Sequence, residues 1–157
     1  MDDVYREAAR LMEKVTYQPK HFEIREVLPE DFYYANVSKY GAYLWTMFDE
    51  RILMAADMLR DRYGSMICND WAWGGPINYR GWRPFDYGEG APLSQHKFGR
   101  ALDLVPLEVS AEEIREDMSR NNTVKFWGYI KRVENDTAWL HIDCANTGRD
   151  EILFFNP

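Results

Sequence analysis

Two short segments contain histidine and aspartate residues of the type and spacing that hold a metal ion. His96 and Asp103 lie seven residues apart in the segment SQHKFGRALD, a spacing suited to a loop that enters a strand. His141 lies further along the chain, in the segment AWLHIDC. Two imidazoles and one carboxylate, with a fourth position left to water, would form an open tetrahedral zinc site of the catalytic type. We therefore predict a Zn2+ site with these three residues as ligands.

The segment AWLHIDC predicts a strand with two unlike faces, because successive side chains of a strand point to opposite sides. One face is wholly apolar and suits a core; it carries Ala138, Leu140, Ile142 and Cys144. The other presents an imidazole between an indole and a carboxylate, and it carries Trp139, His141 and Asp143. This second face is typical of a functional site. The alternative is a solvated His141 that only pairs with Asp143.

Asp103 is the only charged residue in ALDLV, which we predict to be a buried strand. A buried carboxylate costs free energy unless a partner or a cation compensates its charge, and a metal ion would do so. Gly99 permits a backbone conformation or a close approach that a Cβ atom would obstruct, and Ala101 leaves room beside it. The alternative for Asp103 is a buried ion pair with one of three arginines, Arg80, Arg83 or Arg100.

The pattern Ser94-x-His96-x-x-Gly99-x-Ala101-x-Asp103 resembles the S-x-H-x-x-G-x-A-x-D signature of the M15 zinc peptidases, and WLHID resembles their second motif. That family comprises D-Ala-D-Ala carboxypeptidases, dipeptidases and bacteriophage endolysins, and its fold is related to the hedgehog signalling domain. The resemblance implies the same three zinc ligands. It also implies a hydrolase, a metallopeptidase that cuts peptide bonds in the stem peptides of peptidoglycan during cell wall degradation.

The segment RGWR, which ends at Arg83, resembles the arginine-bearing segment that precedes the first motif of the family. The resemblance implies that Arg83 holds a carboxylate of the substrate or stabilises the oxyanion. Arg80 is a weaker rival for that role.

The general base is the point at which the sequence departs from the family. Several members place a catalytic carboxylate three residues before the second histidine, where this chain has Ala138. We rank Glu134 first as the replacement, Asp143 second and Asp136 third. Asp143 has the alternative role of orienting the imidazole of His141. If none of these carboxylates is the base, the chain would be a zinc-binding virion structural or interaction protein without catalysis.

The helices and strands that must position these residues are predicted to form one α+β domain over residues 1–157. We expect a helix and a wrapping loop over residues 1–40, with the helix at 3–15, and a catalytic core over 41–157. The core would contain a helix at 42–63, a strand at 65–71, a long loop at 74–93 and a capped helix after Ser110. A hairpin of residues 125–133 and 138–144 and a strand at 151–155 would follow. The resemblance implies a small antiparallel sheet with helices packed on one side.

Composition excludes some partners and leaves others open. The net charge of −7 argues against nucleic acid, which favours a basic face. We expect neither a secretory signal nor a membrane span. With the resemblance, this predicts an enzyme of the host bacterial cytoplasm that is released to the cell wall, or a virion-associated one. The two cysteines, Cys68 and Cys144, are predicted to be small buried residues, and a bridge between them stays open.

Other residues near the motifs carry weaker signals. His21 is predicted to be structural, because it lies in a loop far from both motifs. Five aromatic residues surround the arginine segment, and they suit either a sheet edge or the wall of a groove for a peptide or glycan; they are Trp71, Trp73, Tyr79, Trp82 and Tyr87.

Overall fold

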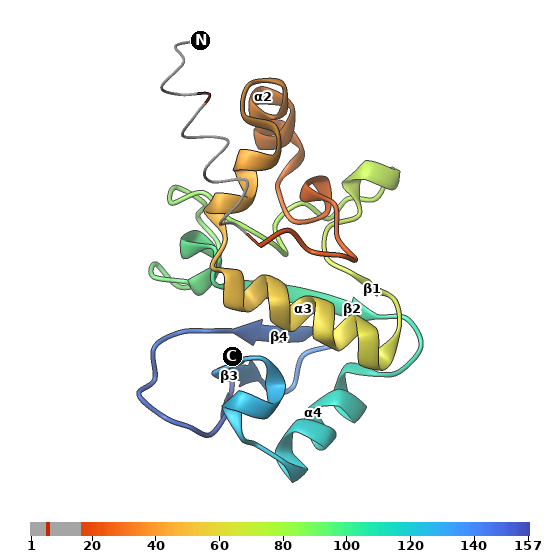
Figure 1. The fold of residues 1–157 in the computed structure, drawn as a ribbon, viewed down its shortest axis with the longest axis vertical. Coiled ribbons are helices and arrows are strands. Elements are labelled where there is room, and N and C mark those ends of the chain that lie inside the picture. Colours follow the sequence, from red (N-terminus) through yellow and green to blue (C-terminus); the bar gives the residue numbers. More distant parts are fainter. Residues whose placement is uncertain (1–5, 7–16) are drawn as a thin grey trace.

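A five-stranded mixed sheet forms the centre of the computed structural model, which describes Arg6 and residues 17–157 (Figure 1). The strand order is β1-β2-β4-β3-β5. The strands are β1 Met66–Ile67, β2 Ala101–Pro106, β3 Arg132–Glu134, β4 Leu140–Asp143 and β5 Leu153–Phe155. The helix predicted over residues 3–15 lies outside the described residues, apart from Arg6.

The expectation of a wholly antiparallel sheet is wrong at one edge. β2 pairs antiparallel with both β1 and β4, and β4 pairs antiparallel with β3. β5, in contrast, pairs parallel with β3. After β4 the chain reverses direction through residues 144–152 and reaches the far side of β3, so that β5 runs in the same direction as β3.

The helices differ from the predicted ones where local capping decides their limits. The α-helices are α2 Glu30–Tyr40, α3 Glu50–Tyr63 and α4 Ala111–Arg120. The helix predicted over 42–63 is divided, because the Asp49 side chain accepts a hydrogen bond from the Arg51 backbone and so starts α3. The capping box of α4 is confirmed, since Ser110 and Glu113 exchange the two expected bonds.

Short 3-10 turns replace parts of two predicted strands. The turns are η1 Ile24–Glu26, η2 Gly41–Met47, η3 Trp71–Trp73, η4 Gln95–Phe98 and η5 Val124–Trp127. The strand predicted over 65–71 is limited to β1, and only its last residue, Trp71, falls in η3. The strand predicted over 125–133 begins within η5 and contributes only its end to β3. The wrapping loop predicted within 1–40 contains α2, a helix without a fully buried residue.

One hydrophobic core lies between the sheet and its helices. α3 and α4 both bring apolar side chains to this core, among them Ile52, Leu59, Ile114 and Met118. The strands contribute Leu102, Leu104, Val133, Leu140 and Ile142. Because side chains alternate along a strand, the residues between these positions point to the other face of the sheet. α3 and α4 therefore cover one face, and polar residues of β2, β3 and β4 gather on the opposite one.

Candidate metal centre

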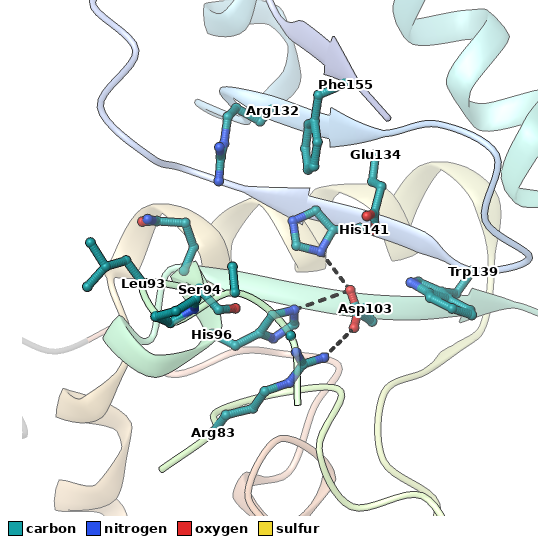
Figure 2. Close-up of a pocket in the computed structure, with 14 residues that line it drawn as sticks. Arg83, Leu93, Ser94, His96, Asp103, Arg132, Glu134, Trp139, His141 and Phe155 are labelled. Atoms are coloured by element: carbon teal, nitrogen blue, oxygen red, sulfur yellow. Dashed lines mark hydrogen bonds and ion pairs between the residues drawn. The ribbon is translucent and has the colours of Figure 1, made fainter. Parts of the chain in front are cut away.

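The sheet brings the three predicted ligands into one buried cluster (Figure 2). Asp103 and His141 are direct partners in the antiparallel register of β2 and β4. His96 lies in η4, immediately before β2. One ligand atom of each residue lies within 4.8 Å of those of the other two, so the group could hold a metal ion.

The two polar contacts between the ligands converge on one carboxylate oxygen. His141 Nδ1 lies 2.7 Å from Asp103 Oδ1, and His96 Nε2 lies 3.3 Å from the same atom. The three residues are between 2% and 8% exposed, which leaves little water to screen their charges. Imidazole and carboxylate are the donors that Zn2+ accepts alongside thiolate, so this set fits zinc chemically.

The second ring nitrogen or carboxylate oxygen of each ligand also has a polar partner outside the cluster. His96 Nδ1 lies 2.7 Å from the carbonyl oxygen of Gly81, which leaves Nε2 to face the cluster. Arg83 Nη2 donates to Asp103 Oδ2 at 3.0 Å. The remaining nitrogen of the third ligand, His141 Nε2, lies 3.1 Å from Asp143 Oδ2. Such outer contacts fix the orientation of metal-binding side chains.

The backbone at Gly99 explains how η4 and β2 reach this geometry. Gly99 has φ +65°, and a Cβ atom there would overlap the carbonyl oxygen of Met47. Its own carbonyl accepts a hydrogen bond from the Asp49 backbone at 2.9 Å. Gly99 is predicted to permit a special conformation or a close approach, and the structure shows both at this position.

Burial and hydrogen bonding act in opposite directions on the pKa values of the cluster. Burial favours the neutral form of Asp103, but the charge of His96 and the hydrogen bonds of both histidines hold the pKa of this carboxyl well below its usual range. Burial would likewise lower the pKa of His141, but its hydrogen bonds to Asp103 and Asp143 raise the pKa to about 9. The metal-free cluster is thus an ion-paired network.

Arg83 forms an ion pair with Asp103, the predicted alternative to a metal ion at this carboxylate. The ion pair lies within the histidine cluster itself. Arg83 Nε donates to the carbonyl oxygen of Tyr79 at 2.6 Å, which fixes the guanidinium beside Asp103. Arg80 instead lies over the ring of Trp139, with its Cζ atom 5.8 Å from the ring centroid. Arg100 lies over Phe98 in the same manner.

A cavity of about 620 Å³ opens onto the cluster, within the size range of ligand pockets. Glu134 lines it from β3, and Figure 2 shows its side chain on the same side of the sheet as His141. The whole lining comprises Arg83, Gly90, Ala91, Pro92, Leu93, Ser94, Gln95, His96, Asp103, Arg132, Glu134, Trp139, His141 and Phe155.

The three carboxylates ranked as the general base occupy different places. Glu134 lines the cavity. Asp143 is completely buried and contacts both His141 and Arg132, the arrangement of a group that orients an imidazole. Asp136 lies exposed in the turn after β3, with φ 56°, and does not line the cavity.

The other residues singled out in the sequence lie away from the cavity. His21 contacts Asp61 on α3 at 2.6 Å, in agreement with a structural role. Both cysteines are buried and free, so the bridge between Cys68 and Cys144 is not formed. None of the five aromatic residues near the arginine segment lines this cavity, whose aromatic lining consists of Trp139 and Phe155.

Sequence reasoning missed Gly81, Arg132 and Phe155. Gly81 approaches the chain so closely that a Cβ atom would overlap the carbonyl oxygen of Val27, and a lone glycine gives no signal of this. Arg132 could have been found, because it lies two residues before Glu134 and therefore shares its face of β3. Phe155 reaches the cavity only through the parallel pairing of β5 with β3.

Comparison with known proteins adds no relative to this geometry. No family model, curated protein or solved structure matches the chain. No helix among the described residues is long and apolar enough to cross a membrane. The functional argument therefore starts from the cluster and its cavity.

Proposed function

We propose that this protein is a zinc-dependent peptidase that hydrolyses peptide bonds in peptidoglycan stem peptides, with a hedgehog-related fold like that of the M15 zinc peptidases. One observation carries the proposal: a buried His-Asp-His cluster forms part of a cavity that a further carboxylate, Glu134, also lines. A structural zinc site is usually closed and rich in cysteine, whereas this cluster offers three ligands and an open side.

The chemistry follows from the residues around the cluster. When bound, zinc lowers the pKa of its water toward about 7 and polarises a carbonyl group. Glu134 accepts the proton of the attacking water and passes it to the leaving amine. Arg83 holds Asp103 through Nη2, while its Nη1, beside Gly90, has no acceptor among the described residues. This second group donates to a substrate carboxylate or to the developing oxyanion.

The cellular setting belongs to the same proposal. By analogy with phage endolysins, the enzyme accumulates in the host bacterial cytoplasm before it is released to the cell wall, or it is carried by the virion. A zinc-binding virion protein without catalysis is the second candidate, and the observation in its favour is Ala138 at the position of the family carboxylate.

The test is an assay of purified protein on isolated peptidoglycan, with new amino termini identified by mass spectrometry and zinc measured by elemental analysis. We expect one zinc per chain and peptide release that a chelator abolishes and added zinc restores. Absence of zinc would contradict both candidates. Zinc without peptide release would favour the non-catalytic one, and unchanged turnover in His96→Ala would exclude zinc from the reaction.

A further inference from the structure

Arg132 lines the cavity beside the metal cluster, and its hydrogen bonds and ion pair among the described residues go to Asp143 and not to the three ligands. It begins β3 and is the direct register partner of Asp143 on β4. Its side chain lines the cavity (Figure 2) and is 30% exposed. No step of the proposed hydrolysis uses this residue.

Two contacts hold the guanidinium in one place. Its Nε donates to both oxygens of Asp143, at 2.9 and 3.0 Å, and its Nη2 lies 2.8 Å from Asp143 Oδ2. Its Cζ atom also lies 5.0 Å from the centroid of the Phe155 ring, over the face of that ring. A planar fork with a delocalised charge satisfies both contacts at once, which the point charge of a lysine cannot do.

Asp143 needs this partner because it is completely buried. An uncompensated carboxylate in such a place is strongly unfavourable. The Ala145 backbone donates one further hydrogen bond, at 3.0 Å, and the remaining contact is to His141 Nε2 at 3.1 Å. Arg132 and the backbone therefore fix the plane of the carboxylate and the direction in which it meets the imidazole.

The contact between Asp143 and His141 Nε2 also affects the other ring nitrogen, Nδ1, which is the predicted ligand atom. Both nitrogens of His141 face carboxylates, Nδ1 that of Asp103 at 2.7 Å and Nε2 that of Asp143 at 3.1 Å, and an ionised carboxylate only accepts hydrogen bonds. With a metal ion held at Nδ1, that nitrogen would offer its lone pair to the ion, and Asp143 would keep the ring proton on Nε2. Phe155 packs edge-on against the same imidazole, with 5.8 Å between ring centroids and 90° between ring planes. Phe155 of β5 thus packs against both the imidazole and the guanidinium.

We propose that Arg132 is a positioning residue of the metal centre, which acts through Asp143 to hold the ring and the tautomer of His141 that bind the ion. The inference rests on the proposed zinc site and adds a dependence that the ligands alone do not show. Metal loading depends on a side chain at the start of a neighbouring strand, on the cavity wall.

The experiment measures the zinc affinity of the full-length chain by competition with a chelating dye. Arg132→Lys keeps the charge and loses the fork, and we expect it to weaken zinc binding by about 10- to 100-fold, as changes in outer partners of metal ligands typically do. Arg60→Lys is the matched control. Arg60 also lies over a phenylalanine ring, that of Phe22, and bonds a backbone carbonyl, but on α3 away from the cluster. It should leave the affinity unchanged.

A double-mutant cycle separates positioning from general damage to the fold. If Arg132 acts through Asp143, then Arg132→Lys should have little further effect once Asp143→Asn is present. Nitrogen chemical shifts of His141 supply a second readout, because wild-type protein reconstituted with zinc should carry the ring proton on Nε2, and Arg132→Lys should lose this uniform state.

The outcomes distinguish this inference from the proposed function. Wild-type protein that binds no zinc would contradict the metal site and the role of Arg132 with it. Wild-type protein that binds zinc, together with Arg132→Lys of equal affinity or with additive effects in the cycle, would overturn the role of Arg132 alone.

Discussion

Asp103 and His141 lie directly opposite each other on β2 and β4, and their side chains meet at 2.7 Å on the face away from the core. Two of the three ligands are thus placed by the register of a sheet, and the third, His96, by a turn that leads into one of its strands. A shift of register by one residue would send one of the two side chains into the core. The same apolar residues that stabilise the fold therefore also fix the ligand geometry.

Glu134→Gln should abolish peptide release and leave zinc binding intact, because it removes the proton acceptor and none of the ligands. We expect a loss of at least about 100-fold in kcat. The matched control is Asp136→Asn, since asparagine tolerates the positive φ of the turn and Asp136 does not line the cavity. Equal losses in the two variants would show that Glu134 is not the base.

Zinc uptake by the metal-free protein should release a proton at neutral pH. The pKa of His141 is raised from 6.5 to about 9 in the folded protein, so this imidazole is protonated at pH 7 and must lose its proton to bind an ion. Apparent affinity should rise with pH and level off near pH 9. Calorimetry in buffers of different ionisation enthalpy counts the protons, and uptake without proton release would contradict the ion-paired state.

The free energy of unfolding of the metal-free protein should fall as the pH rises through the pKa of His141. A group whose pKa is raised by folding stabilises the folded state below its unfolded pKa, and this contribution is lost as pH rises through the folded value. For His141 the contribution is complete below about pH 6.5 and is lost toward pH 9. Urea midpoints measured across this range should fall, and the fall should disappear in His141→Gln.

Gly99→Ala should destabilise the protein more than Gly148→Ala, although both glycines have φ +65°. The backbone strain of alanine, about 1–2 kcal/mol, is common to both. Only at Gly99 would the new Cβ also overlap a carbonyl oxygen, whereas nothing lies within 4 Å of that position at Gly148. We expect a difference of at least about 1 kcal/mol in the free energy of unfolding. Equal losses would show that Met47 moves aside easily.

Both cysteines should resist thiol reagents in the native protein. Burial raises the pKa of Cys144 to about 12 and raises that of Cys68 well above its usual range, so neither forms the reactive thiolate at neutral pH. Two thiols should be modified per chain in denaturant and none before, as mass spectrometry would show.

The ligand cluster could be predicted from the sequence because it depends on strand alternation and on one glycine. The two faces of AWLHIDC and the charge of Asp103 in ALDLV already indicate which side chains share a surface. The start of α3 at Asp49 also had a local signal, an aspartate followed by a glutamate.

Other features had no local signal. α2 has no fully buried residue, so no apolar period marks it. The parallel pairing of β5, and with it the position of Phe155 in the cavity, depends on how the chain returns past β4. Capping and alternation are properties of neighbouring residues, whereas such pairings depend on the whole sheet.

Phe155 completes the cavity from the strand that joins the sheet by its only parallel pairing among the described strands. That pairing joins residues closer in the chain, such as Arg132 and Leu153, than the pairing of β2 with β4, which joins Asp103 and His141. During folding, the wall at Phe155 therefore closes the shorter loop, and the contact between the two ligands closes the longer one. After dilution from denaturant, recovery of zinc binding should therefore not precede the burial of Phe155 against β3.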